Sequence, residues 1–204
     1  MHPFSLRELE YEKPNSPGEL LREISARSGL VKKASAATLK SLLEYGSFPE
    51  PFLAQDSKYA RLWRAGRTEK VIREDLRDLS RLPELSRIEM LAALLPERVG
   101  SLLSIAALRE DLEVSHDTVS RWLSYLKELY YVFELKPFRG SMRRSLRKEG
   151  KLYLWDHSEV DDPAARFENL VAAHLLKACH YWTDAYLRAV TGKDPERAGW
   201  LTAV

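Results

Sequence analysis

The chain has 204 residues, of which 45% are hydrophobic and 30% are charged, with a formal net charge of +2. A chain of this size buries roughly 70% of its unfolded surface, so it folds without disulfides or a structural metal. This balance excludes an intrinsically disordered chain, and no run approaches the roughly 20 apolar residues of a membrane span. The N-terminus lacks a signal-peptide core, and the single cysteine, Cys179, cannot form an internal disulfide. We therefore expect a cytoplasmic protein without membrane association.

The N-terminal region predicts helices. Residues 38–45 favour a short helix that ends at Gly46, because glycine suits the left-handed position that closes a helix. Residues 58–79 carry apolar side chains at roughly helical spacing, and Pro83 ends this segment. The sequence Ser86-Arg87-Ile88-Glu89 is typical of a capping box, so the next helix is expected to open there.

The following segment predicts two helices joined by a tight turn. Residues 101–112 favour a short apolar helix, Glu113 and Val114 form the turn, and Ser115 is a good N-cap for the next helix. In that second helix one stripe is apolar and the opposite side is polar, and the stripe consists of Val119, Leu123, Leu126 and Tyr130. This pattern predicts a helix-turn-helix. A positive φ at Glu113 would cost about 1 kcal/mol.

After the second helix the pattern becomes extended. Residues 131–135 and 151–155 are rich in β-branched and aromatic side chains, which predicts two strands of a hairpin. Residues 139–151 carry a net charge of +5, and the rest of the chain carries −3. A basic run is often only a solvated surface. Here it lies between two strands that follow a helix-turn-helix, so it is typical of a wing that contacts phosphates.

The candidate nucleic-acid contacts form two groups. On the second helix the residues expected nearest the groove are Ser115, His116, Ser120, Arg121 and Ser124. On the wing the residues expected to hold the phosphate backbone are Arg139, Arg143, Arg144, Arg147 and Lys148. Asp117 and Glu128 on the same helix would repel phosphates, and winged helices also serve in protein–protein contacts. A regulatory or scaffold module is therefore the alternative function.

The C-terminal region shows no complete catalytic or metal site. An amphipathic helix is expected over residues 164–180, with one apolar side formed by Phe167, Leu170, Val171, Leu175 and Leu176. The acidic cluster of Asp156, His157, Glu159, Asp161 and Asp162 is interpreted as a solvated loop, because no nucleophile or paired base accompanies it. His174, Cys179 and His180 lack the spacing of metal ligands on a helix. No cofactor is predicted.

Three segments together resemble a known family. Residues 42–49 (LLEYGSFP), 71–76 (VIREDL) and 112–123 (LEVSHDTVSRWL) resemble, in order and spacing, the C-terminal region of a family of prokaryotic AAA+-type ATPases, catalogued as DUF4143. The resemblance extends over about residues 3–185. It implies that an ATPase domain is missing, since the chain contains no G-x-x-x-x-G-K-[ST] motif.

The resemblance also implies a partner and a vestigial nuclease. The partner would be a separate ATPase domain or a sister subunit, and Glu168 would be the first acidic residue of a nuclease-like fold. One carboxylate does not hold the magnesium that phosphodiester cleavage requires. We therefore expect neither ATPase nor nuclease activity.

The sequence thus predicts a mainly α (α+β) protein in three parts. Residues 1–85 form a helical region that follows the missing ATPase domain, residues 86–157 a winged helix-turn-helix, and residues 158–204 a truncated α/β, nuclease-like remnant. The predicted function is binding of nucleic acid, as double-stranded DNA, without enzymatic activity.

Overall fold

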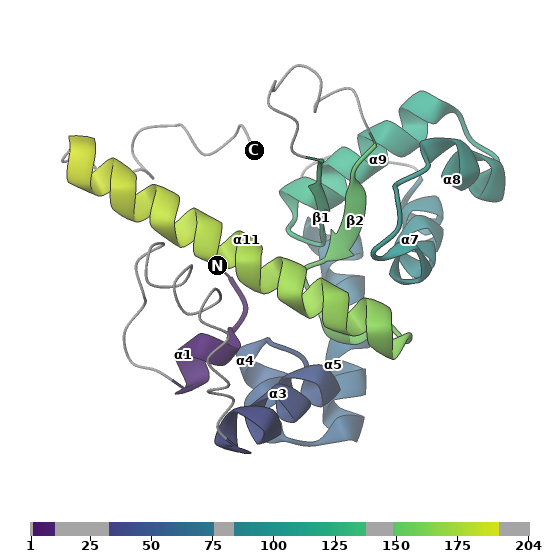
Figure 1. Cartoon of the computed structure of the whole chain (residues 1–204). Coiled ribbons are helices and arrows are strands. Elements are labelled where there is room, and N and C mark those ends of the chain that lie inside the picture. Colours follow the sequence, from purple (N-terminus) through teal and green to yellow (C-terminus); the bar gives the residue numbers. More distant parts are fainter. Residues whose placement is uncertain (1, 11–32, 76–83, 138–148, 192–204) are drawn as a thin grey trace.

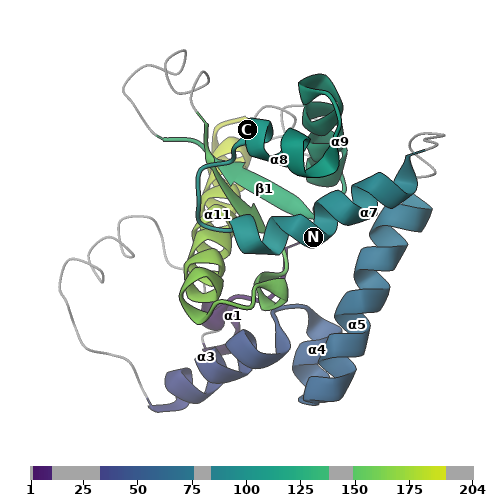
Figure 2. The same ribbon diagram turned by 90° about the vertical axis from the view of Figure 1, so that its right-hand side faces the viewer.

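The computed structural model of the chain describes residues 2–10, 33–75, 84–137 and 149–191. This part of the protein is mainly helical, with one two-stranded antiparallel sheet, which confirms the predicted mainly α class. The N-terminal helices lie below the sheet in Figure 1, and the long helix α11 crosses both regions. The sheet lies between α11 on one side and the helices α8 and α9 on the other (Figure 2).

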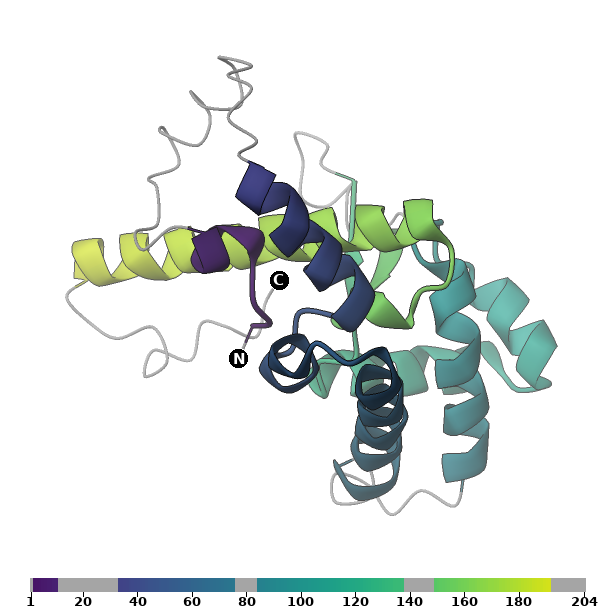
Figure 3. The same cartoon turned by 90° about the horizontal axis from the view of Figure 1, so that it is seen from below.

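The N-terminal region contains α1 (Leu6–Glu10), α3 (Lys33–Tyr45), α4 (Pro49–Ala54) and α5 (Ser57–Lys70). As predicted, helix α3 ends just before Gly46, which has a φ of +91°. A Cβ atom at Gly46 would lie 2.8 Å from Oγ of Ser158, so glycine serves both the helix end and a close approach. Viewed from below, α1 and α3 lie beside α11 (Figure 3).

Three helical segments follow α5, and the start of one of them differs from the expectation. The π-helix η1 (Val71–Asp75) continues α5, and α7 (Leu85–Leu94) leads into the short 3-10 helix η2 (Leu95–Arg98). The predicted capping box is wrong, because α7 begins before Ser86 and no side chain caps it. Ser86 lies inside the first turn instead of at the N-cap, and Oε1 of Glu89 accepts from Nε of Arg73 at 2.6 Å.

The predicted turn between two helices is present. It joins α8 (Ile105–Leu112) to α9 (His116–Glu128). Ser115 caps α9 as expected, because its Oγ accepts a hydrogen bond from the Thr118 amide at 3.1 Å. Glu113 has a φ of +52°, so the anticipated strain at this position is real. The predicted start of the first helix at residue 101 is wrong, because the helix begins at Ile105 and Ser104 caps it by accepting from the Ala107 amide.

The predicted hairpin is confirmed. Strand β1 (Val132–Leu135) pairs antiparallel with β2 (Lys151–Leu154), with Val132 opposite Leu154 and Leu135 opposite Lys151. Residues 100–103 pair with the free edge of β2. The Gly100 amide donates to the Leu152 carbonyl at 3.0 Å, and the Leu103 amide donates to the Gly150 carbonyl at 2.8 Å. The chain between η2 and α8 therefore forms an isolated antiparallel bridge at this edge, with Leu102 opposite Lys151.

One hydrophobic cluster fills the space between these elements, and it extends from Val71 to Ala172. Helix α9 contributes Val119, Trp122, Leu123 and Leu126 to it. Trp122 is fully buried, so its ring packs in the core and is inaccessible to a nucleic-acid base. The division of the chain into three parts stays a prediction.

The last described elements are the 3-10 helix η3 (His157–Glu159) and α11 (Pro163–Thr191). The carboxylate of Asp162 accepts the Ala165 amide at 2.7 Å and so opens α11. The helix extends beyond the predicted end at residue 180. Among the helices that the structure describes, none is both long and apolar enough to cross a membrane.

Candidate nucleic-acid interface

The outer face of α9 carries its predicted contact residues on the surface. The side chains of His116, Asp117 and Arg121 are 61%, 102% and 49% exposed, respectively. Ser124 and Glu128, further along the helix, are exposed as well. The inner face packs in the core, so the polar side of the helix is the one exposed to solvent.

The serines of this face are engaged within the helix itself. Oγ of Ser120 donates to the His116 carbonyl at 2.9 Å, and Oγ of Ser124 donates to the Ser120 carbonyl at 3.1 Å. Ser115 serves as the N-cap. Because a hydroxyl has a single hydrogen, Ser120 and Ser124 offer only their oxygen lone pairs to a partner.

The charges around α9 do not form a basic surface. Residues 105–137 contain four basic and six acidic side chains, a net charge of −2. A terminal nitrogen of Arg121 lies 3.8 Å from Oε2 of Glu84, which precedes α7. A carboxylate of the same protein thus partly neutralises Arg121 on the outer face of α9.

The predicted wing contacts Arg139, Arg143, Arg144, Arg147 and Lys148 lie outside the described residues. The structure describes the strands on either side of them, with Leu135 opposite Lys151 as the last pair of the register.

Lys151, which closes the basic run, is already paired. Its Nζ donates to Glu168 on α11 at 2.9 Å. At the same end of the hairpin, Glu134 accepts from Nζ of Lys127 at 2.6 Å and from the Gly150 amide at 3.1 Å. These bonds fix the base of the hairpin to α9 and α11.

The carboxylate of Glu168 is engaged in hydrogen bonds that hold α11 against strand β2. Besides Lys151, the hydroxyl of Tyr153 donates to it at 2.8 Å, and these two hydrogen bonds hold the pKa of Glu168 below its usual value. Its carboxylate also covers Gly100, where a Cβ atom would approach it to 3.3 Å. Within the described ranges, no three histidine, cysteine or acidic side chains are grouped to hold a metal ion.

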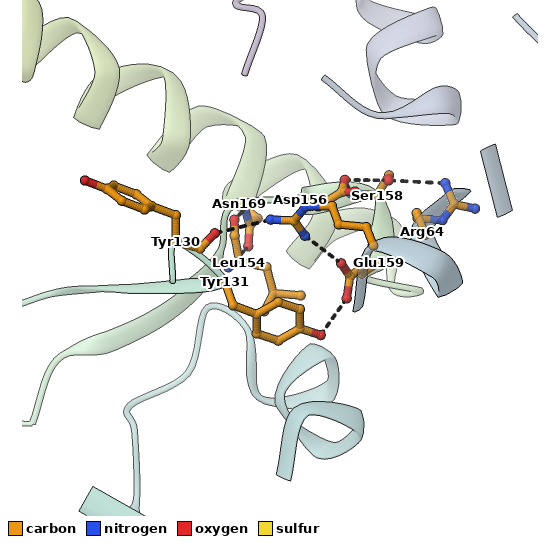
Figure 4. Close-up of polar contacts among 9 residues, drawn as sticks. Arg64, Tyr130, Tyr131, Leu154, Asp156, Ser158, Glu159 and Asn169 are labelled. Carbon is orange, nitrogen blue, oxygen red and sulfur yellow. Dashed lines mark hydrogen bonds and ion pairs between the residues drawn. The ribbon is translucent and has the colours of Figure 1, made fainter. Parts of the chain in front are cut away.

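Sequence reasoning missed a buried polar network behind the hairpin (Figure 4). The interpretation of residues 156–162 as a solvated loop is wrong for its first half, because Asp156 and His157 are only 1% exposed. Oδ1 of Asp156 accepts the hydroxyl of Ser158 at 2.6 Å, and Arg64 on α5 donates to that hydroxyl oxygen at 3.2 Å. Nε2 of His157 lies 2.9 Å from the Leu42 carbonyl. Asp161 and Asp162 are exposed, as expected.

The same network holds the two residues that directly precede β1, Tyr130 and Tyr131. The hydroxyl of Tyr131 donates to Glu159 at 2.7 Å, and Arg67 on α5 contacts the other oxygen of Glu159 at 3.4 Å. Arg67 also donates to the carbonyl of Tyr130 at 3.2 Å, a residue held at a φ of +53°. Burial, with a smaller contribution from Asp156, raises the pKa of Glu159 to about 7. Burial also raises the pKa of Tyr131.

A cleft of about 530 Å³ opens onto this network between α5–η1 and α7–η2. Its polar lining includes Arg64, Thr68, Tyr131 and Glu159, and Arg73 and Glu89 from its two walls form the ion pair described above. Tyr131 and Glu159 are hydrogen-bonded to each other, and Arg67 on α5 contacts Glu159 and the Tyr130 carbonyl. These contacts primarily join the N-terminal helices to the hairpin. One local signal was readable: an aspartate followed two residues later by serine at a strand end is typical of a side chain–backbone turn.

Comparison with known proteins identifies the family. The model of a family described as "Domain of unknown function (DUF8612)" matches residues 36–160. The chain belongs to this family. Uncharacterized proteins of Mycobacterium bovis (Mb2031c) and Mycobacterium tuberculosis (Rv2008c) are each 26% identical to it over 135 residues. These matches cover 66% of the chain and 31% of each relative, so the chain spans about a third of their length. No solved structure matches the chain.

The expected membership in the DUF4143 family of AAA+-type ATPases is therefore wrong. The motifs behind it meet local structural needs. Gly46 ends a helix with a positive φ, Pro49 begins α4, and Ser115 caps α9. Such solutions recur wherever the same local geometry is needed, so they do not by themselves distinguish one family from another.

Proposed function

We propose that the chain binds double-stranded nucleic acid, as DNA, and that α7, α8, α9 and the β1–β2 hairpin act as a winged helix-turn-helix. One observation carries the proposal: the hairpin follows α9 directly, and the segment that connects its strands contains six basic residues. Glu149 is the only acidic residue of that segment.

The order of the elements supports this proposal. A helix, a short edge segment, two helices joined by a tight turn and a hairpin follow one another from α7 to β2. This is the element order of a winged helix, in which the second helix of the turn faces the groove and the hairpin lies beside the backbone. Exposed Arg121 on α9 is suited to a bidentate contact with guanine.

The charges predict how the affinity is divided. The surface of residues 105–137 is net negative, whereas the hairpin connection is strongly positive. Contacts from Arg139, Arg143, Arg144, Arg147 and Lys148 to phosphates would supply most of the affinity, and α9 a modest sequence preference. The serines of α9, engaged in their own helix, would act mainly as acceptors. The function requires no catalytic residue, metal or cofactor.

Fluorescence anisotropy on two unrelated duplexes across a salt series tests the proposal. Neutralising about five phosphates predicts that affinity falls by roughly two to three orders of magnitude between 50 and 200 mM salt. Arg121→Ala should change the ratio of affinities for the two duplexes, because only a base contact distinguishes sequences. Absence of saturable binding to both duplexes at low salt would contradict the proposal.

A protein-contacting module is the second candidate. The net negative charge around α9 and the proximity of Glu84 to Arg121 favour it, because both weaken attraction to phosphate. In that case the polar face of α9 would contact a partner protein or a sister subunit, and the chain would show no salt-dependent binding to duplexes.

A further inference from the structure

Helix α11 has a second apolar face that the sequence pattern did not separate from the first. Leu170 and Ala172 are buried against the body of the protein. By contrast, Phe167, Val171 and Leu175 are 47%, 40% and 51% exposed. The expectation that all the large apolar residues of this helix share one side is therefore wrong. Residues four apart lie above one another on a helix, so the three exposed side chains form a continuous stripe.

The stripe continues at both ends with small residues. Ala164, one turn before Phe167, is exposed, and Ala178, one turn after Leu175, is half-buried. The charged side chains in this part of the helix are held elsewhere. Arg166 donates to the Val160 carbonyl, and Lys177 donates to the Pro3 carbonyl.

Glu168 is bound to Lys151 and Tyr153, as described above. The charged residues between Ala164 and Ala178, namely Arg166, Glu168 and Lys177, are therefore all held in contacts elsewhere on the protein, and an exposed apolar surface of this kind marks an interaction site.

We propose that this stripe, from Ala164 to Ala178, is the contact surface of a homodimer in which two copies of α11 pack antiparallel about a two-fold axis at Val171. A two-fold interface needs a surface that is complementary to itself. The stripe has this symmetry: Phe167 of one copy faces Leu175 of the other, Val171 faces itself, and Ala164 faces Ala178.

Position and charge favour a second copy as the occupant. Phe167, Val171 and Leu175 are exposed while Leu170 and Ala172 are buried. Figure 1 shows α11 as the front layer of the molecule. Because the stripe is neutral, two identical faces meet without like-charge repulsion. The alanines at its ends allow the helix axes to approach to about 8–10 Å.

The size of the contact sets its strength. Fourteen residue steps separate Ala164 from Ala178, or about 21 Å of helix. One helix face of this length covers less than the roughly 800 Å² per partner of a standard interface, so the dimer is weak and depends on concentration. The proposal is independent of nucleic-acid binding.

Sedimentation equilibrium of the full chain between about 5 and 500 µM tests the dimer, because weak interfaces dissociate within this range. The average mass should rise from 23.5 kDa towards twice that value. Val171→Lys should abolish the rise, since it places two like charges on the two-fold axis. Leu62→Lys is the matched control, because Leu62 on α5 is 64% exposed and lies off the stripe; its dimer should be unchanged. Circular dichroism confirms that both variants are folded.

Cysteine cross-linking tests the arrangement of the two helices. Val171→Cys in a Cys179→Ser background should cross-link efficiently with a short bis-maleimide, because both cysteines lie at the axis. The wild-type Cys179, exposed on the same helix, should not, since its two copies would be about 24 Å apart along the helices. A monomer at every concentration, a larger assembly insensitive to Val171→Lys, or cross-linking through Cys179 but not at position 171 would overturn the proposal.

Discussion

Two polar regions of this protein look alike in sequence and differ in the structure. Residues 156–159, between β2 and α11, combine acidic, histidine and serine side chains, and so does the outer face of α9. In the first region Asp156 and His157 are buried, and α5 supplies their neighbours. In the second, His116 and Asp117 are exposed and contact mainly their own helix.

The difference teaches that residue type does not decide whether a polar cluster is structural or free. A polar cluster is structural when a second helix or strand packs against it and supplies hydrogen-bond or ion-pair partners. Arg64 and Arg67 on α5, more than ninety positions earlier in the chain, contact Ser158 and Glu159. At α9 the approaching group is Glu84, whose single contact with Arg121 is 3.8 Å long. The first region is therefore expected to govern stability and the second to govern binding.

Asn169, which is buried on α11 and drawn with the same polar contacts in Figure 4, offers the largest expected effect on the contrast between buried and exposed polar groups. This buried side chain on α11 accepts from the Leu154 amide at 2.8 Å and donates to the Leu154 carbonyl at 2.7 Å, in place of a neighbouring strand. Asn169→Leu leaves both backbone groups unsatisfied and should lower the free energy of unfolding by about 3 kcal/mol.

Urea denaturation measures this change, with Ser124→Ala on α9 as the comparison. That substitution removes only a surface hydroxyl and should change stability by less than about 0.5 kcal/mol. Equal losses in the two variants would remove the distinction between the regions.

Glu159 predicts a pH dependence. Its pKa of about 7 in the folded protein lies above its unfolded value, so the folded state favours the protonated form. The stability that it contributes is present below about pH 4.5 and is lost as pH rises through 7, by about 3 kcal/mol. Glu159→Gln lacks this titration and keeps an acceptor for Tyr131. Thermal unfolding from pH 4.5 to 8 should therefore show wild type losing stability relative to the variant as pH rises; parallel profiles would contradict the assignment.

His174 acts in the opposite direction and serves as the control for that profile. It accepts the Leu6 amide at 2.8 Å, and burial lowers its pKa to about 4. Its stabilising contribution is present above about pH 6.5 and is lost as pH falls from there towards 4. His174→Gln should remove this acid-side loss and leave the Glu159 effect in place.

Glu113 in the turn before α9 predicts the smallest effect. A non-glycine residue at a φ of +52° is strained, so Glu113→Gly should raise the free energy of unfolding by up to about 1 kcal/mol. Glu110→Gly, within α8, should instead lower it by about 1 kcal/mol. Chemical denaturation of both variants checks the opposite signs, and a loss of stability in the first would show that the turn is not strained.

The features predicted correctly from sequence are those that local chemistry determines. The helix end at Gly46, the cap at Ser115 and the pairing of β1 with β2 involve residues close in the chain or alternating patterns. The contacts that sequence did not predict join distant residues, such as His157 with Leu42 and Asn169 with Leu154. The same limit applies to α11, where periodicity finds apolar residues but does not tell which face meets the body.

The most direct test of the nucleic-acid proposal compares two triple variants with the same loss of charge. One replaces Arg143, Arg144 and Arg147 with alanine, and the other replaces Lys58, Arg61 and Lys70, which are exposed on α5. Fluorescence anisotropy across a salt series should show that the first variant loses affinity for all duplexes and that its salt slope flattens by about three. The second should stay close to wild type. Equal effects in both variants, or no effect in the first, would contradict binding through the wing.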